Sequence, residues 1–85
     1  MKYELVFAKS AEKEYDKLRP PHLKLVTKKL DELETNPRPA GCLKLKGFDG
    51  ETWRVRAGDY RILYTIEDVL RIVDIRKIRH RSDAY

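Results

Sequence analysis

The sequence predicts an α+β fold: a strand, a helical hairpin and then a three-stranded antiparallel meander, with the helices packed on one face of the sheet. Three observations lead to this prediction. Apolar residues recur at helical spacing between residues 8 and 33, and they alternate from residue 52 onward. A loop rich in proline and glycine separates the two regions. The length of 85 residues allows one domain, over residues 1–85, with a small core.

The first part of the chain predicts a strand and two helices. Residues 3–7 are rich in aromatic and aliphatic side chains, which is typical of a short strand. A first amphipathic helix follows and ends before Pro20, and Pro21 fits the first position of a second helix. The second helix ends at the loop of residues 36–41, whose prolines cannot continue it. The apolar positions of the two helices are Ala8, Ala11, Tyr15 and Leu18, and then Leu23, Val26, Leu30 and Leu33.

The second part predicts the meander. Residues 52–57 alternate and residues 60–66 are rich in β-forming side chains, and Gly58-Asp59 between them suits a two-residue hairpin turn. A weaker turn signal at Glu67-Asp68 precedes a third predicted strand, residues 69–76.

The hairpin turn predicts the register, in which Arg56 lies opposite Arg61. Directly opposed residues share a face of the sheet. One face then carries Trp53, Val55, Ile62 and Tyr64, and the other carries Arg54, Arg56 and Arg61 together with Leu63. The cationic face has two interpretations: a solvated surface whose guanidinium groups find acidic partners, or a surface that binds phosphate groups.

Charge favours an anionic partner. The net charge is +5, from 19 Lys and Arg against 14 Asp and Glu, and residues 76–81 hold four cations and a histidine. His80 can exchange a proton near neutral pH, and Tyr85 can stack on a base. One cysteine and two histidines predict neither a disulfide framework nor a metal site, and we expect no cofactor. The sequence has no apolar run long enough to span a membrane, and its N-terminus does not show the pattern of a signal peptide. We therefore expect a cytoplasmic protein that does not bind membranes.

Four segments together resemble the RelE/ParE superfamily of bacterial and archaeal toxins, and in particular its RelE branch. The segments are residues 36–39 (NPRP), 43–47 (LKLKG), 53–64 (WRVRAGDYRILY) and 78–85 (IRHRSDAY). The resemblance covers essentially the whole chain. It implies a toxin of a type II toxin–antitoxin system that cleaves mRNA in the ribosomal A site. It also implies that the partners are a cognate RelB-like antitoxin, the ribosome and mRNA.

The resemblance also implies the site residues. The catalytic group would consist of Arg54, Arg56, Arg61, Arg79, His80, Arg81 and Tyr85. The residues that would bind RNA are Lys44, Lys46, Arg76 and Lys77. Arginines at these positions would stabilise the charge that develops on the phosphate, while His80 and Tyr85 would transfer protons. Three alternatives stay open: a ParE-like inhibitor of DNA gyrase, a basic RNA-binding protein without catalysis, and a degenerate toxin that acts only in complex with its antitoxin.

Overall fold

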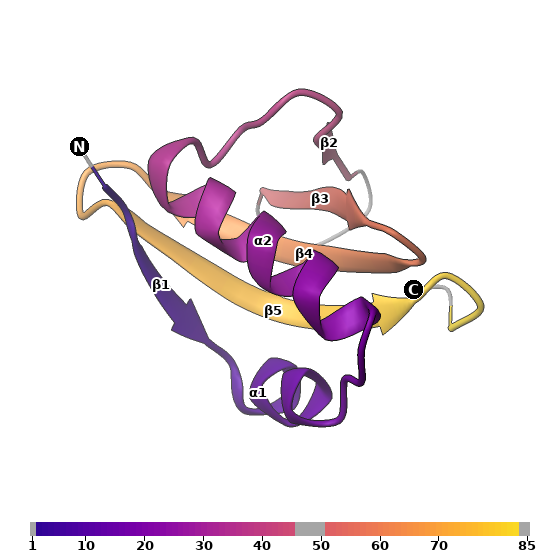
Figure 1. The fold of residues 1–85 in the computed structure, drawn as a ribbon. Coiled ribbons are helices and arrows are strands. Elements are labelled where there is room, and N and C mark those ends of the chain that lie inside the picture. The colour runs from indigo at the N-terminus through magenta and orange to yellow at the C-terminus, as the bar shows by residue number, and fades with distance from the viewer. Residues whose placement is uncertain (1, 46–50, 84–85) are drawn as a thin grey trace.

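The computed structural model describes residues 2–45 and 51–83 of the chain, and it confirms the predicted α+β class (Figure 1). Two helices pack on a five-stranded mixed sheet. In chain order the elements are β1 (Glu4–Phe7), α1 (Lys9–Asp16), α2 (His22–Thr35), β2 (Leu43–Lys44), β3 (Thr52–Ala57), β4 (Tyr60–Glu67) and β5 (Ile72–His80).

The sheet has the strand order β1-β5-β4-β3-β2. Strands β3, β4 and β5 form the predicted antiparallel meander. Two further pairings complete the sheet: β1 runs parallel to β5 at one edge, and the short β2 pairs with β3 at the other. The sequence did not predict β2, because two residues are too few to show an alternating pattern.

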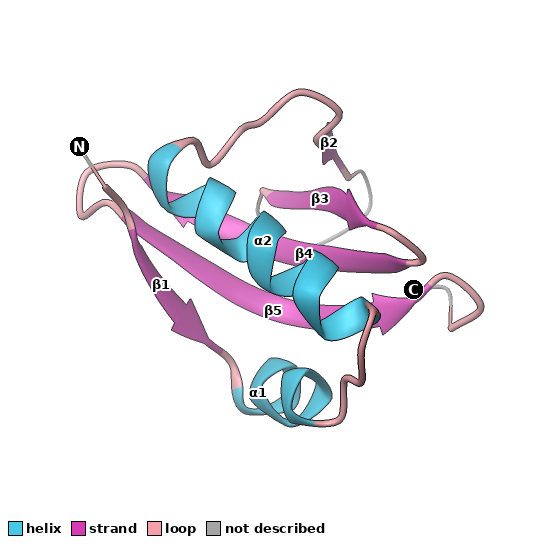
Figure 2. Cartoon of the chain, viewed as in Figure 1, coloured by secondary structure: helices cyan, strands magenta, loops and turns pink. Residues whose placement is uncertain are grey.

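The helices cover one face of the sheet, and α2 crosses it diagonally (Figure 2). The apolar stripe of α2, which is Val26, Leu30 and Leu33, is buried against this face. The strands supply the other side of the core with Val55, Ala57, Ile62, Tyr64, Val73, Ile75 and Ile78. Burial of one such aliphatic side chain contributes roughly 1.5–3 kcal/mol, so this layer holds α2 in place.

The predicted bounds of the third strand are wrong. Residues 68–71 form a turn, and Val69 and Leu70 are 87% and 69% exposed at its tip. Strand β5 instead begins at Ile72, which pairs with both Glu67 and Glu4, and it continues to His80. Residues 76–80 therefore belong to the strand and do not follow it. Pairing with two neighbouring strands outweighs the β propensity of Val69 and Leu70.

Smaller differences occur at the helix ends. Helix α1 ends at Asp16, although Leu18 beyond it is still buried. Pro21 is the N-cap of α2, whose first residue is His22, so its prediction as the first helical residue is wrong by one position.

A register shift between Leu63 and Tyr64 decides which side chains of β5 face the helices. Leu63 pairs with Lys77, but Tyr64 pairs with Ile75, which leaves Arg76 as the extra residue of a β-bulge. The bulge lets Ile75 and Ile78 both reach the core although they are three residues apart. It also places Lys77 and Arg79 on the opposite face.

Replacing Gly58 by alanine is expected to lower the stability of the fold measurably. Its φ is +63°, and an added Cβ would lie 2.8 Å from Cδ1 of Leu25 in α2. We expect Gly58→Ala to lower the free energy of unfolding by about 1–2 kcal/mol from the backbone alone, and further because Leu25 must shift. Gly41→Ala is the matched control, because Gly41 has a φ of +90° but nothing within 4 Å of an added Cβ. Urea unfolding of both variants checks this; an equal loss would show that the Leu25 contact is unimportant.

Candidate functional site

A row of three arginines crosses the uncovered face of the sheet. Arg56 of β3 pairs with Arg61 of β4, and Arg61 pairs with Arg79 of β5. The next row holds Val55, Ile62 and Ile78, which are buried beneath the helices. Because neighbouring residues of a strand point to opposite faces, the arginines point away from the helices. Arg54, two residues before Arg56, lies on the same side, and we call Arg54, Arg56, Arg61 and Arg79 the arginine face.

The row lacks acidic partners in its middle. In the part of the chain that the structure describes, neither Arg56 nor Arg61 forms an ion pair with a carboxylate, and Nη1 of Arg61 is buried without a hydrogen-bond partner. Like charges that face each other across strands are destabilising, and a buried donor without a partner costs more. An anion in front of Arg61 would relieve both costs. The planar fork of arginine suits a phosphate group in this place.

An apolar side chain forms part of the same face. Leu63 lies between Arg54 and Lys77 in the sheet, as the predicted hairpin register requires, and it is only 1% exposed. The aliphatic stems of long cationic side chains cover apolar surface in this way while their charged ends stay in water. Leu63 therefore adds a buried apolar side chain to the base of the arginine face.

Three more predicted residues lie at or beside this face. Lys77 is opposite Leu63 and shares its side of the sheet. Arg76 is the bulge residue, and its Nη1 lies 3.0 Å from Oδ2 of Asp74, so part of its charge is neutralised. Arg81 donates its backbone N–H to the carbonyl of Asp59 at 2.8 Å, which extends the ladder past the end of β5. Its Nε lies 3.8 Å from Oδ1 of the same aspartate.

His80 lies on the helix-covered side. It pairs with Tyr60, and the two rings meet edge to face with 5.3 Å between their centroids. The centroid of the His22 ring, at the start of α2, lies 5.2 Å from the centroid of the Tyr60 ring. Nδ1 of His80 lies 2.8 Å from the hydroxyl oxygen of Ser82 and accepts the backbone N–H of the same serine at 3.2 Å. His80 therefore lies on the opposite side of β5 from the arginine row, although it lines a small pocket together with Arg79 and Glu14.

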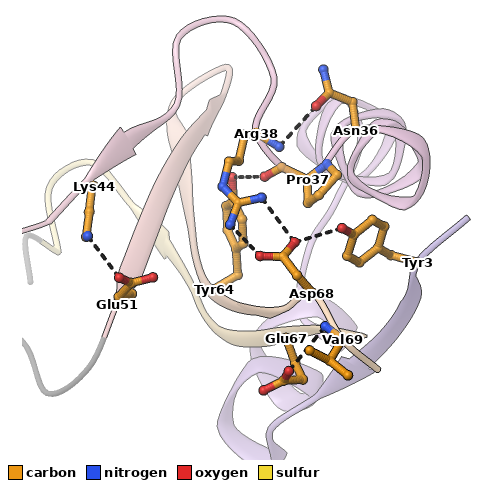
Figure 3. A network of polar contacts seen from close by, with 10 residues as sticks. All are labelled: Tyr3, Asn36, Pro37, Arg38, Lys44, Glu51, Tyr64, Glu67, Asp68 and Val69. Carbon is orange, nitrogen blue, oxygen red and sulfur yellow. Dashed lines mark hydrogen bonds and ion pairs between the residues drawn. The ribbon is translucent and has the colours of Figure 1, made fainter. Parts of the chain in front are cut away.

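The remaining predicted residues are apart from the arginine face or outside the described residues. Lys44 pairs with Trp53, which lies on the helix-covered side, and its Nζ is 3.1 Å from Oε1 of Glu51 (Figure 3). Lys46 and Tyr85 lie outside the described residues. Their predicted roles in RNA binding and catalysis stay predictions.

Sequence reasoning missed a polar cluster that ties the proline loop to the turn after β4. Both guanidinium Nη atoms of Arg38 donate to Asp68, at 3.2 and 2.9 Å, and the hydroxyl of Tyr3 donates to the same carboxylate at 2.8 Å (Figure 3). The guanidinium also lies 5.2 Å from the ring centre of Trp53. Beside it, the buried hydroxyl of Tyr64 donates to the carbonyl of Pro37 at 2.8 Å, and burial raises the pKa of Tyr64. The contacts join residues too distant in the sequence to give a local signal.

This cluster makes the stability of the folded chain depend on pH in the acidic range. Hydrogen bonds from Arg38 and then from Tyr3 lower the pKa of Asp68 below its usual value of about 3.9. The stabilisation is therefore present above about pH 4 and is lost as the pH falls toward the lower pKa of the folded state. We expect wild type to melt at a higher temperature than Asp68→Asn at pH 7, with a difference that shrinks below pH 4. Melting curves from pH 7 to pH 2 test this, with the exposed Asp31→Asn as control; a difference independent of pH would contradict it.

A hollow of about 640 Å³ lies between α2 and the end of β3. Its lining combines an apolar side chain, Leu25, with charged residues of α2 and with Arg56. Strand β2 pairs only with Trp53 and Arg54, so in the described part of the chain the edge of β3 from Val55 to Ala57 has no strand beside it. The hollow thus adjoins an open sheet edge and one arginine of the arginine face.

The described residues contain neither a membrane-spanning helix nor a metal-binding cluster. Neither helix there has the length and apolar character that a membrane crossing needs. In those same stretches of chain, no three His, Cys, Asp or Glu side chains gather where they could hold a metal ion.

Comparison with known proteins relates the chain to toxins. Residues 5–85 match a family described as the ParE toxin of the type II toxin–antitoxin system parDE. The putative toxin RelE1 of Methanocaldococcus jannaschii is 38% identical over 88 residues, which covers 100% of this chain and 97% of that protein.

Two solved structures resemble the fold closely. The archaeal RelE–RelB complex from Pyrococcus horikoshii OT3 contains a chain with a TM-score of 0.82 and 28% identity, covering 99% of this chain and 100% of that one. The RelBE2 toxin–antitoxin complex from Mycobacterium tuberculosis contains one with a TM-score of 0.81 and 29% identity, covering 95% and 100%.

Proposed function

Because the chain belongs to the ParE toxin family of type II toxin–antitoxin systems, within the RelE/ParE superfamily, we propose that it is a RelE-like, ribosome-dependent endoribonuclease. It would cut mRNA in the ribosomal A site and so stop translation, which requires it to act in the cytoplasm. The observation that carries the proposal is the row of three arginines whose middle member, Arg61, has a buried nitrogen without a partner.

The arginine face matches the electrostatic demand of RNA cleavage. The 2′-oxygen of a ribose attacks the adjacent phosphorus, and the bond from phosphorus to the 5′-oxygen breaks, leaving a 2′,3′-cyclic phosphate and a 5′-hydroxyl. Negative charge builds up on the phosphate oxygens in the transition state, and preorganised cations stabilise it best. We assign this role to Arg54, Arg56 and Arg61, with Arg79 or Arg81 near the leaving oxygen.

The proton transfers need groups other than arginine, because arginine stays protonated in proteins. A base must take the proton of the 2′-hydroxyl and an acid must protonate the 5′-oxygen. We assign these steps to His80 and Tyr85, which together would contribute roughly 10²–10⁴-fold to the rate. Since His80 packs on Tyr60 at the end of β5, its part in the reaction requires that RNA reach around that end of the strand.

The cognate partner in this proposal is a RelB-like antitoxin. The related toxins of Pyrococcus horikoshii and Mycobacterium tuberculosis form complexes with antitoxins. We propose that the antitoxin places apolar side chains in the hollow between α2 and β3 and acidic side chains over the arginine face. Purified complex would then cleave ribosomal mRNA much more slowly than the free toxin.

Primer extension on cellular mRNA after induction of the chain without its antitoxin tests the proposal. We expect cuts within translated regions, in phase with codons, and none in a strain that produces Arg61→Ala instead. Cuts outside translated regions, or none at all, would refute ribosome-dependent cleavage.

Inhibition of DNA gyrase is the second candidate, because the matching family is that of ParE toxins. A supercoiling assay with purified gyrase separates the two. Inhibition of supercoiling without any mRNA cleavage would favour the gyrase function. RNA binding without any cleavage, with an affinity for RNA that His80→Ala alters, would favour a binding protein without catalysis.

A further inference from the structure

Helix α1 contacts the edge of β5 beyond the point where its pairing with β1 ends. The pairing of β1 with β5 stops at Phe7 and Ile75, followed by one more bond from the N–H of Ala8 to the carbonyl of Ile75. Beyond this point the N–H of Ile78 would face the edge without a strand to accept it. Oε1 of Glu14, in α1, accepts that N–H at 2.8 Å. One carboxylate oxygen thus replaces a strand and fixes α1 against the last part of β5.

The second oxygen of the same carboxylate contacts the arginine row. Oε2 of Glu14 lies 2.7 Å from Nε of Arg79, and the two side chains are only 25% and 36% exposed. Nε of Arg79 is buried and makes no aligned hydrogen bond, so attraction between the charges holds the pair together. The contact is at Nε, and among the described residues the two terminal nitrogens of Arg79 have no ion-pair partner, so within that part of the chain they can bind a ligand.

We propose that Glu14 is a positioning residue for Arg79, holding it as a phosphate-binding group of the arginine face. This inference rests on the proposed function, since the phosphate is that of the mRNA. Glu14 is also the acidic group that touches the row of Arg56, Arg61 and Arg79 among the described residues, and it offsets part of their mutual repulsion. The same carboxylate ties that charge balance to the backbone of Ile78, so Arg79 keeps its place when RNA is absent.

The variant Glu14→Gln separates the two contacts. Glutamine keeps an oxygen that accepts the N–H of Ile78, but it lacks the charge that attracts Arg79. Glu12→Gln is the matched control, because Glu12 is exposed on the same helix and its replacement by glutamine removes the same charge. Thermal melts verify that both variants are folded.

Two measurements decide the proposal. The first is hydrogen exchange of the Arg79 side-chain N–H, followed by NMR, which we expect to be faster in Glu14→Gln and unchanged in Glu12→Gln. The second is single-turnover cleavage of mRNA at saturating ribosome, which we expect to slow about tenfold in Glu14→Gln. In an Arg79→Ala background, Glu14→Gln should cause no further loss.

Each other outcome counts against the proposal. Unchanged exchange of the Arg79 N–H would show that Glu14 does not hold the side chain. Unchanged cleavage, or equal slowing in the Arg79→Ala background, would show that Glu14 has only a structural role. If the wild-type protein does not cleave mRNA at all, the proposed function is wrong, and so is the role of Glu14 in cleavage. Faster Arg79 exchange in Glu14→Gln would then distinguish this failure from a wrong assignment of the contact.

Discussion

Replacing Arg61 by alanine is expected to slow mRNA cleavage about 10²–10³-fold at saturating ribosome, the effect of losing about 2.7–4 kcal/mol from one preorganised donor. Arg61 lies between Arg56 and Arg79 in the sheet, and its Nη1 is buried without a partner. Its charge is therefore in place before the phosphate arrives. Binding to the ribosome should change much less than the rate, because a ribosome offers many contacts and the scissile phosphate only one.

Stability should respond in the opposite sense to activity. Arg61→Ala removes like-charge opposition on both sides, so the melting temperature should stay the same or rise. Single-turnover kinetics beside a thermal melt measure both effects. An unchanged rate would reject the role of Arg61 at the phosphate, and a large drop in melting temperature would reject its placement on the uncovered face.

Arg71→Asn is the suitable control for the lost charge. Arg71 lies in the turn between β4 and β5, at the end of these strands away from the arginine row. Its φ is +56°, a backbone conformation that asparagine tolerates better than most residues. Arg38 is unsuitable, although it lies in a loop, because its pairing with Asp68 and its contact with Trp53 make it part of the structure.

Free RNA is expected to be cleaved at least about 10⁵-fold more slowly than the same mRNA on the ribosome. Correct placement of reacting groups contributes roughly 7–11 kcal/mol, and each 1.36 kcal/mol is a factor of ten in rate. The arginine face is the surface of a sheet, and the hollow of about 640 Å³ lies between α2 and β3. His80, moreover, is on the other side of the sheet. The chain therefore needs the ribosome to hold the 2′-oxygen, the phosphorus and the leaving oxygen in line.

Single-turnover assays with one mRNA, free and bound in the A site, measure this ratio. Ribosomes with an empty A site provide the control for nonspecific stimulation. Rapid cutting of free RNA at the same codons would contradict the prediction and would assign the whole reaction to the chain itself.

The central hairpin shows how far local pattern determines structure. Gly58 adopts the positive φ of a tight turn, and the alternation on both sides predicts every pair from Trp53 with Tyr64 to Ala57 with Tyr60. A shift by one residue would bury Arg56 and expose Val55, which the hydrophobic effect forbids. The sequence alone therefore determined that Arg54, Arg56 and Arg61 share one face. The apolar stripe of α2 likewise determined which side of that helix is buried.

The tertiary structure decided which residues from outside the hairpin lie on or beside the arginine face. The bulge at Arg76 places Arg79 in the arginine row and His80 beneath the helices, whereas a contiguous run of basic residues gives no sign of which side each one takes. Glu14 reaches Ile78 across 64 positions of the chain, and Arg38 reaches Asp68 across 30. Such contacts depend on how the sheet and the helices pack together in the folded chain. Spacing along a sequence reports the period of one helix or strand, and it contains no information about which distant side chain comes to lie beside it.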